Sequence, residues 1–110
     1  DVYKRQTEID PNLVVPDTKK SLIQEAIKPI GSQPKGFHGS KLGALAREFD
    51  LSFSKPWNKL SKEIRTILLY GLSGKKIDVD YNSSNFSGTY KGKWEGVIPE
   101  LQRRYKQTQS

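Results

Sequence analysis

Apolar residues recur at helical spacing in three segments of the chain. Residues three or four positions apart lie on one face of an α-helix, so each stripe predicts a helix with one buried side. Ser40 and Ser61 precede the first two stripes as N-caps, and Pro99 suits the first turn of the third helix. Gly71 and Gly74 end the second helix. The stripes are Leu42, Leu45, Ala46 and Phe49; Ile64, Ile67 and Leu68; and Ile98, Leu101 and Tyr105.

Alternating polar and apolar residues predict a β-hairpin before the last helix. Residues 76–81 alternate in this way, residues 82–85 have turn chemistry, and residues 86–94 form the returning strand. Because side chains alternate across a strand, Lys91 and Lys93 should share one face of this second strand. Tyr90, Gly92 and Trp94 should then occupy the other face.

The chain before Ser40 gives weaker signals. Residues 9–15 read as a short extended piece, either an edge strand or a connector, because two prolines bracket β-branched residues. Ser21 and Gln24 form a capping-box pattern, which predicts a short helix that stops near Pro29. Three glycines and a proline make residues 31–39 a loop. The apolar stripe of the short helix is Ile23, Ala26, Ile27 and Ile30.

Together these patterns predict an α+β fold, with about four short helices packed against a small antiparallel β-hairpin. A lone hairpin is marginally stable, so we expect it to pack on the helices. With 110 residues and 34% hydrophobic content, the chain fits one small domain with a thin core, which its aromatic residues enlarge. The residues that we expect to be buried are Ile64, Leu68, Leu45, Phe49, Ile98 and Leu101.

The charge balance is strongly basic. The chain has 19 lysines and arginines against 12 acidic residues, a formal net charge of +7. Such an excess favours phosphate-rich partners or an anionic surface, although the same charge also serves as an ordinary solvated surface. No apolar run approaches the roughly 20 residues that cross a bilayer, and the start has no signal-peptide pattern. We therefore expect no membrane partner and a cytoplasmic location.

Catalytic and metal-binding chemistry finds little support in the sequence. The chain has no cysteine and a single histidine, His38, so neither a zinc site nor a serine triad can be assembled convincingly. Residues 71–76 are rich in glycine and lysine but lack the spacing of a phosphate-binding P-loop. A P-loop follows a strand, whereas a predicted helix precedes these residues. We expect no catalytic residue, metal or cofactor in this segment.

Cations interleaved with aromatic residues are the remaining candidate for a binding surface. Lysines and arginines near the hairpin and the last helix suit phosphate contact more than base reading, so binding should depend on salt and ignore base sequence. The alternative for each cation is a solvated charge, and for each aromatic it is core packing. The candidate DNA-binding residues are Lys35, Lys41, Lys75, Lys76, Lys91, Lys93, Arg103, Arg104 and Lys106.

Four groups of residues resemble, in the same order, segments of the UvrA family, the damage-sensing ATPases of bacterial nucleotide excision repair. Together they cover most of the chain from Ile9 to Ser110. Glu25 stands where the family usually has Gly, Ile30 where Trp is frequent, and Trp94 where Phe is frequent. The matching groups are residues 96–99 with 103–105 and 108–110; 10–11 with 13–17; 21–22 with 26–27 and 29; and 56–57 through 60 to 68–71.

The resemblance implies that residues 7–110 are the insertion domain of a larger, dimeric parent, and that residues 1–6 are a non-native leader. The parent would use ATP with Mg²⁺ and structural zinc, would act with a UvrB-like protein in an excinuclease complex, and would bring this domain to double-stranded DNA. The domain itself would not hydrolyse ATP. The alternative is a protein-interaction or spacer module within the same parent. A continuous basic patch across hairpin and last helix favours DNA contact, whereas scattered cations favour the spacer.

Overall fold

The computed structural model describes residues 9–30, 36–82 and 87–109, and its side chains are described for 9–30, 40–80 and 87–105. The leader proposed for residues 1–6, the turn residues 83–85 and Lys35 lie outside these ranges. The described residues confirm the α+β prediction, with four α-helices and one two-stranded antiparallel sheet. The elements are α2 (Pro11–Val14), α3 (Gly36–Phe49), α4 (Lys62–Tyr70), β1 (Lys76–Asn82), β2 (Ser87–Lys93) and α5 (Val97–Gln109), with 3-10 turns at Leu22–Gln24 and Trp57–Lys59.

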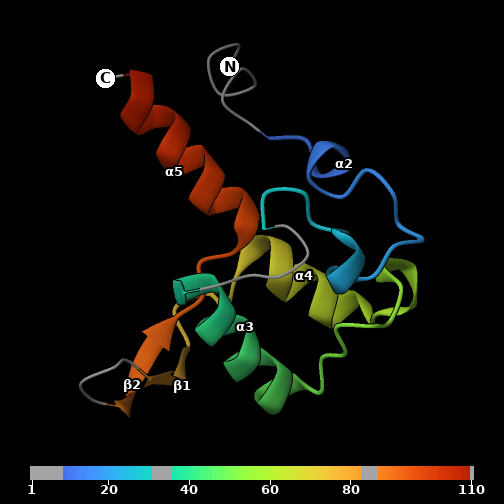
Figure 1. The fold of residues 1–110 in the computed structure, drawn as a ribbon. Coiled ribbons are helices and arrows are strands. Elements are labelled where there is room, and N and C mark those ends of the chain that lie inside the picture. Colours follow the sequence, from blue (N-terminus) through green and yellow to red (C-terminus); the bar gives the residue numbers. More distant parts are fainter. Residues whose placement is uncertain (1–8, 31–35, 83–86, 110) are drawn as a thin grey trace.

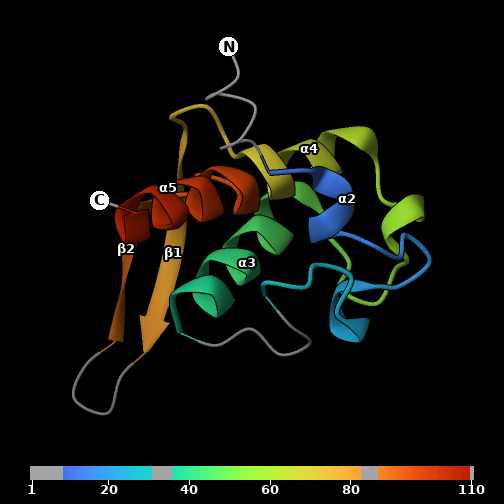
Figure 2. The same ribbon diagram turned by 90° about the horizontal axis from the view of Figure 1, so that it is seen from above.

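The core lies where α3 and α4 meet the inner side of the hairpin. Helix α3 runs alongside β1, and α4 lies between α3 and the root of α5 (Figures 1 and 2). Of the six expected core residues, Leu45, Leu68 and Ile98 are buried, while Ile64, Phe49 and Leu101 are partly buried and pack against the core. The periodicity therefore identified the inward faces of all three helices correctly.

The joint between α4 and α5 is fixed by backbone contacts. The Leu72 amide donates a hydrogen bond to the Trp94 carbonyl at 3.0 Å, and the buried Trp94 indole Nε1 donates to the Ile67 carbonyl at 2.8 Å. Helix α4 begins as expected, because the Ser61 hydroxyl accepts from the Ile64 amide at 3.2 Å. These bonds anchor the end of β2 and the start of α5 to α4.

Residues 9–15 are not extended, which corrects the prediction for this segment. Pro11–Val14 form the short helix α2, because the Asp10 side chain accepts from the Asn12 amide at 2.9 Å and Pro11 occupies the first turn. The β-branched residues that suggested a strand are buried instead: Val14 and Val15 are 3% and 5% exposed. Burial against the core has overridden their strand propensity.

Two helix boundaries and two apolar residues also differ from the predictions. Helix α3 begins at Gly36, so the predicted loop is wrong over residues 36–39, and Ser40 is not the N-cap of the helix. Each glycine in a helix costs about 1 kcal/mol, which is small enough for tertiary packing to outweigh. The capping box of Ser21 and Gln24 is present but starts a single 3-10 turn, after which Glu25 is left-handed. Ile23 and Tyr105 are 54% and 46% exposed, although Ala26 and Ile27 in the stripe of Ile23 are buried.

Candidate nucleic-acid interface

The outer face of the hairpin is the solvent-facing side of the two strands. Its residues alternate with buried Ile77 and Val79 on β1, and with half-buried Tyr90 and buried Gly92 on β2. Lys91 and Lys93 therefore lie opposite to Tyr90 and Gly92, as the alternation predicted. The outer face includes Lys76, Asp78 and Asp80 on β1 and Thr89, Lys91 and Lys93 on β2, all exposed.

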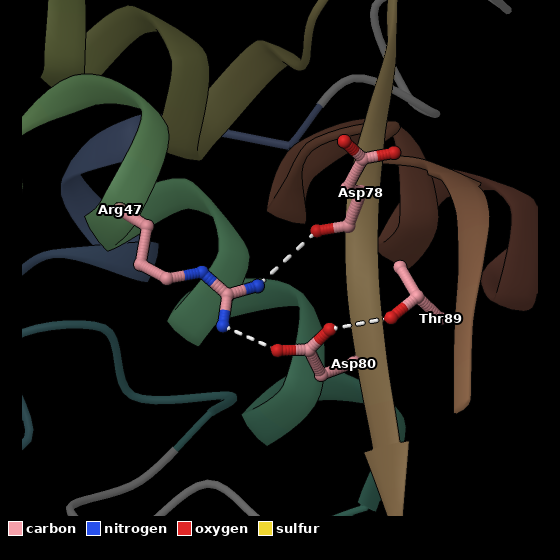
Figure 3. Close-up of polar contacts among 4 residues, drawn as sticks. All are labelled: Arg47, Asp78, Asp80 and Thr89. Atoms are coloured by element: carbon pink, nitrogen blue, oxygen red, sulfur yellow. Dashed lines mark hydrogen bonds and ion pairs between the residues drawn. The ribbon is translucent and has the colours of Figure 1, made fainter. Parts of the chain in front are cut away.

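A polar cluster at Asp80 ties α3 to the hairpin. Arg47 Nη1 lies 2.6 Å from Asp80 Oδ2, and its Nη2 donates to the Asp78 carbonyl at 3.3 Å (Figure 3). The Thr89 hydroxyl donates to the other carboxylate oxygen of Asp80 at 2.8 Å. The Thr89 hydrogen bond, followed by the Arg47 hydrogen bond and charge, lowers the pKa of Asp80 below its ordinary value. One end of the outer face is thus anionic but fully partnered.

Three of the candidate DNA-binding cations are held in exposed ion pairs. Lys91 Nζ lies 2.6 Å from Asp78 Oδ1 across the two strands. Arg103 Nη2 lies 2.6 Å from Glu95 Oε1, and this contact raises the pKa of the Arg103 guanidinium. Arg104 Nη2 lies 2.6 Å from Glu100 Oε1 one turn away, as its spacing predicted. Each pair removes most of the net charge that its cation would offer to an anion.

Lys76 and Lys93 differ from those cations. They are directly opposite in the register of the sheet, both are exposed, and no carboxylate of the described residues pairs with either. Lys75 precedes them, and its Nζ lies 5.6 Å from the centroid of the Phe49 ring. The open end of the hairpin, where β1 begins and β2 ends, is therefore its basic end.

The structure brings together some of the nine candidate cations and leaves others apart. Lys75, Lys76, Lys93 and Lys91 gather on or beside the hairpin, and Arg103 joins them through Glu95, which follows β2. Arg104 is adjacent on α5. Lys41 lies in the first half of α3, Lys35 is outside the described residues, and the side chain of Lys106 is likewise not described.

Sequence reasoning missed two carboxylates that pair with these cations, Asp78 and Glu95. It also assigned no surface role to Arg47 and Asp80, which pair with each other. The alternation of lysine and aspartate along residues 76–80 places both charges on one face, and that signal was available. The pairing of Asp78 with Lys91 could not be predicted from the sequence, because it depends on the strand register.

A shallow groove adjoins the basic end. It has a volume of about 550 Å³ and lies between α4 and the turn into β1. Phe49, Ile67 and Leu72 are among its lining residues, with Lys62 and Lys75 also contributing. Within the ranges that the structure describes, no three His, Cys, Asp or Glu side chains gather as a metal site. No helix in those ranges is long and apolar enough to cross a membrane.

Comparison with known proteins gives a consistent result over almost the whole chain. A family model described as "UvrA DNA-binding domain" matches residues 10–110. Relatives named UvrABC system protein A include that of Brucella abortus, 36% identical over 105 residues, and that of Agrobacterium fabrum, 33% identical over 107; each alignment covers 96% of this chain. The Clostridium tetani protein of the same name is 33% identical over 106 residues, covering 94% of the chain.

The chain spans 11% of the length of each of these relatives. The similarity therefore concerns one domain of a much longer protein. Because the family model covers all but the first nine residues, the chain belongs to the UvrA DNA-binding domain family.

Proposed function

We propose that this domain contacts double-stranded DNA through the basic end of the hairpin and the first turns of α5. The observation that carries the proposal is the convergence of cations from three segments. Lys76 on β1 faces Lys93 on β2, and Arg103 on α5 is held beside them by its ion pair with Glu95. This arrangement supports DNA contact over scattered charge, because cations from β1, β2 and α5 lie on neighbouring segments.

The contact that such a surface can make is with phosphates rather than bases. Lysines on the flat outer face of a two-stranded sheet act as point charges, and binding should fall steeply as salt rises. Phosphate contacts fix position without carrying sequence information. A surface of this kind responds to the shape and deformability of the duplex, which suits a detector that accepts chemically different lesions.

The wider role follows from the family. We propose that the domain is part of a dimeric UvrA-like protein that acts with a UvrB-like partner in nucleotide excision repair, in the cytoplasm. This chain has no cysteine and no P-loop spacing, so its own residues do not fit zinc or ATP with Mg²⁺. Those groups would be bound by other segments of the parent, and no catalytic step is assigned to this domain.

The second candidate function is a spacer or protein-interaction module in the same parent. One observation favours it: Lys91, Arg103 and Arg104 are all engaged in ion pairs within the domain. If every surface cation were neutralised in this way, the positive charge would serve solubility rather than binding. Lys76 and Lys93, which pair with no carboxylate among the residues that the structure describes, are what set the two functions apart.

The test is fluorescence-anisotropy binding of the chain to undamaged and lesion-bearing duplexes across a salt series. One variant replaces Lys76, Lys93, Arg103 and Arg104 with alanine. The matched control replaces four exposed lysines on segments that lie away from the hairpin (Figures 1 and 2), namely Lys19, Lys28, Lys55 and Lys59.

DNA contact predicts affinity that declines with salt, is lost in the first variant and is largely kept in the control. Tighter binding to the damaged duplex would locate discrimination in this domain. Absence of binding at low salt, with Trp57 and Trp94 fluorescence showing a folded chain, would favour the spacer. Both indoles suit this purpose because they are buried, with 5% and 4% exposure.

A further inference from the structure

The first three of the four cross-strand pairs on the outer face of the hairpin differ strongly in charge; the fourth, Asn82 with Ser87, is uncharged. The first three pairs are Lys76 with Lys93, Asp78 with Lys91, and Asp80 with Thr89. Residues two positions apart on each strand share a face, so the three pairs follow one another along the same surface. Side chains directly opposite in an antiparallel sheet have Cβ atoms about 4.5–5.5 Å apart, close enough to interact strongly.

Two of these pairs are satisfied within the domain. Asp78 and Lys91 form an ion pair at 2.6 Å. Asp80 accepts from Thr89 at 2.8 Å and pairs with Arg47 at 2.6 Å (Figure 3). An incoming phosphate would have to compete with the Asp78 carboxylate for Lys91, and at the second pair it would find the Thr89 hydroxyl and Arg47 already engaged by Asp80. Neither pair is suited to hold an anion.

The pair of Lys76 and Lys93 differs because both side chains are positively charged. Like charges directly opposite destabilise a sheet, and no carboxylate of the described residues relieves this pair. The two acids nearest along the chain are both taken: Asp78 pairs with Lys91 at 2.6 Å, and the two oxygens of Glu95 lie 2.6 Å and 3.4 Å from Nη2 and Nε of Arg103. An anion placed between the two ammonium groups would relieve the repulsion and accept hydrogen bonds from both.

We propose that Lys76 and Lys93 form a phosphate-binding subsite that holds one phosphate of the DNA backbone at the basic end of the hairpin. The subsite rests on the proposed function and names the two residues that would hold a phosphate. Lys91, Arg103 and Arg104 are then structural partners of carboxylates rather than principal phosphate contacts. The duplex backbone is confined to the end of the hairpin beside α5, because the carboxylates of Asp78 and Asp80 occupy the rest of the outer face.

The experiment compares three double variants of the chain in duplex binding by anisotropy across a salt series. The subsite variant is Lys76→Ala with Lys93→Ala. A charge control, Lys55→Ala with Lys59→Ala, lowers the formal net charge by the same two units at exposed positions elsewhere. An ion-pair control, Asp78→Asn with Lys91→Gln, removes one pair without changing the net charge.

The subsite variant should lose at least about tenfold in affinity, with a salt slope smaller by about 1. The two controls should stay within about threefold of the parent chain. The subsite variant should also have the same or a higher midpoint urea concentration of unfolding, because replacing the two lysines removes a contact between like charges. A pair of lysines that lowers the stability of the fold but strengthens DNA binding is retained for its function.

The outcomes separate the two proposals. If the parent chain binds no duplex at low salt, both the DNA contact and the subsite are overturned. If the parent binds but the charge control loses as much affinity as the subsite variant, only the subsite is overturned, because general electrostatics then accounts for binding. An equal loss in the ion-pair control would make Lys91 a phosphate contact and would likewise overturn the subsite as stated.

Discussion

The backbones of Gly71 and Gly96 are in direct contact at the joint between α4 and α5. A Cβ on Gly96 would lie 2.6 Å from the Gly71 amide nitrogen, and one on Gly71 would lie 2.4 Å from the Glu95 carbonyl oxygen. Both glycines have left-handed backbones, with φ of +93° and +96°. Neither position therefore has space for a side chain, and both have a backbone conformation that L residues rarely adopt.

Gly96→Ala should lower the free energy of unfolding by about 2 kcal/mol or more, because backbone strain and a clash with fixed backbone atoms add together. Urea unfolding followed by the fluorescence of the buried Trp57 and Trp94 measures the change. Gly74 separates the two causes, since its φ is +88° but a Cβ there meets nothing within 4 Å. Gly74→Ala should cost only about 1 kcal/mol.

The matched control for this series is Gly43→Ala. Gly43 lies inside α3, and a Cβ at this position would meet no other atom within 4 Å. The substitution should raise stability by about 0.5–1 kcal/mol through helix propensity. A Gly96→Ala variant as stable as Gly43→Ala would show that the close approach of α4 and α5 is not present in solution.

Glu25→Gly should stabilise the domain. Glu25 is exposed and left-handed, with φ 67° and ψ 38°, directly after the 3-10 turn. The strain of a left-handed L residue is about 1–2 kcal/mol, and glycine relieves it at some entropic cost in the unfolded chain, leaving a gain of about 0.5–1 kcal/mol. This position is also where the family resemblance usually has glycine.

Asp50→Gly serves as the comparison, because Asp50 is also exposed and left-handed, with φ 57°. Aspartate tolerates this region better than glutamate, so its replacement should gain less. Thermal and urea unfolding of both variants measure the two gains in stability. A greater gain at Asp50 than at Glu25 would contradict the explanation from side-chain type.

The titration of Asp80 should depend on both Thr89 and Arg47. Its pKa is lowered below the ordinary 3.8, first by the Thr89 hydrogen bond and then by Arg47. Because the folded-state pKa is depressed, the contribution to stability is complete above the unfolded-state value. It is lost as the pH falls through the lower folded-state value, so neutral pH is unaffected.

Carboxyl ¹³C NMR titration measures this pKa. Thr89→Val removes the largest single cause and should move the midpoint upward toward 3.8, and Arg47→Ala should also move it upward, because it removes both a hydrogen bond and a positive charge. A titration that Thr89→Val leaves in place but Arg47→Ala shifts would assign the depression to the guanidinium instead.

Asp78→Asn should tighten duplex binding. Asp78 pairs with Lys91 at 2.6 Å, so the neutral side chain frees a lysine on the outer face and removes an anion from it. We expect a gain of a few fold at low salt and a steeper salt slope, by about 0.9 for one further phosphate contact. Anisotropy across a salt series measures both quantities.

Asp17→Asn is the control, since Asp17 is exposed, lies on a segment away from the hairpin and changes the net charge equally. Its Oδ1 accepts from the Lys19 amide at 3.0 Å, a bond that an asparagine oxygen can keep. Equal tightening by both variants would show that binding responds to total charge and not to the release of Lys91.

Periodicity and capping predicted most of the fold because they act over a few residues. Ser61 caps α4 as expected, and Leu45, Leu68 and Ile98 are buried. The failures lie where local signals compete with tertiary packing. Val14 and Val15 have strand propensity but are buried beside a proline-started helical turn.

The candidate cations were predictable as a set, but not by their individual states. Composition identified the lysines and arginines, and alternation placed Lys91 and Lys93 on one face. Which cation is neutralised depends on the partner across the strand. Asp78 pairs with Lys91, while Lys76 has only another lysine opposite, and nothing short of the register distinguishes these cases.

Helix α5 leaves the body of the domain after a short buried root. Val97 and Ile98 are 3% exposed, Leu101 is partly buried, and Arg103 to Tyr105 are exposed, so the later turns extend away from the core (Figure 1). Thirteen residues at about 1.5 Å each give a rod roughly 20 Å long. Only the first turns of the rod are packed on the domain, so the close backbone contact of Gly71 with Gly96 sets the direction in which the exposed turns point.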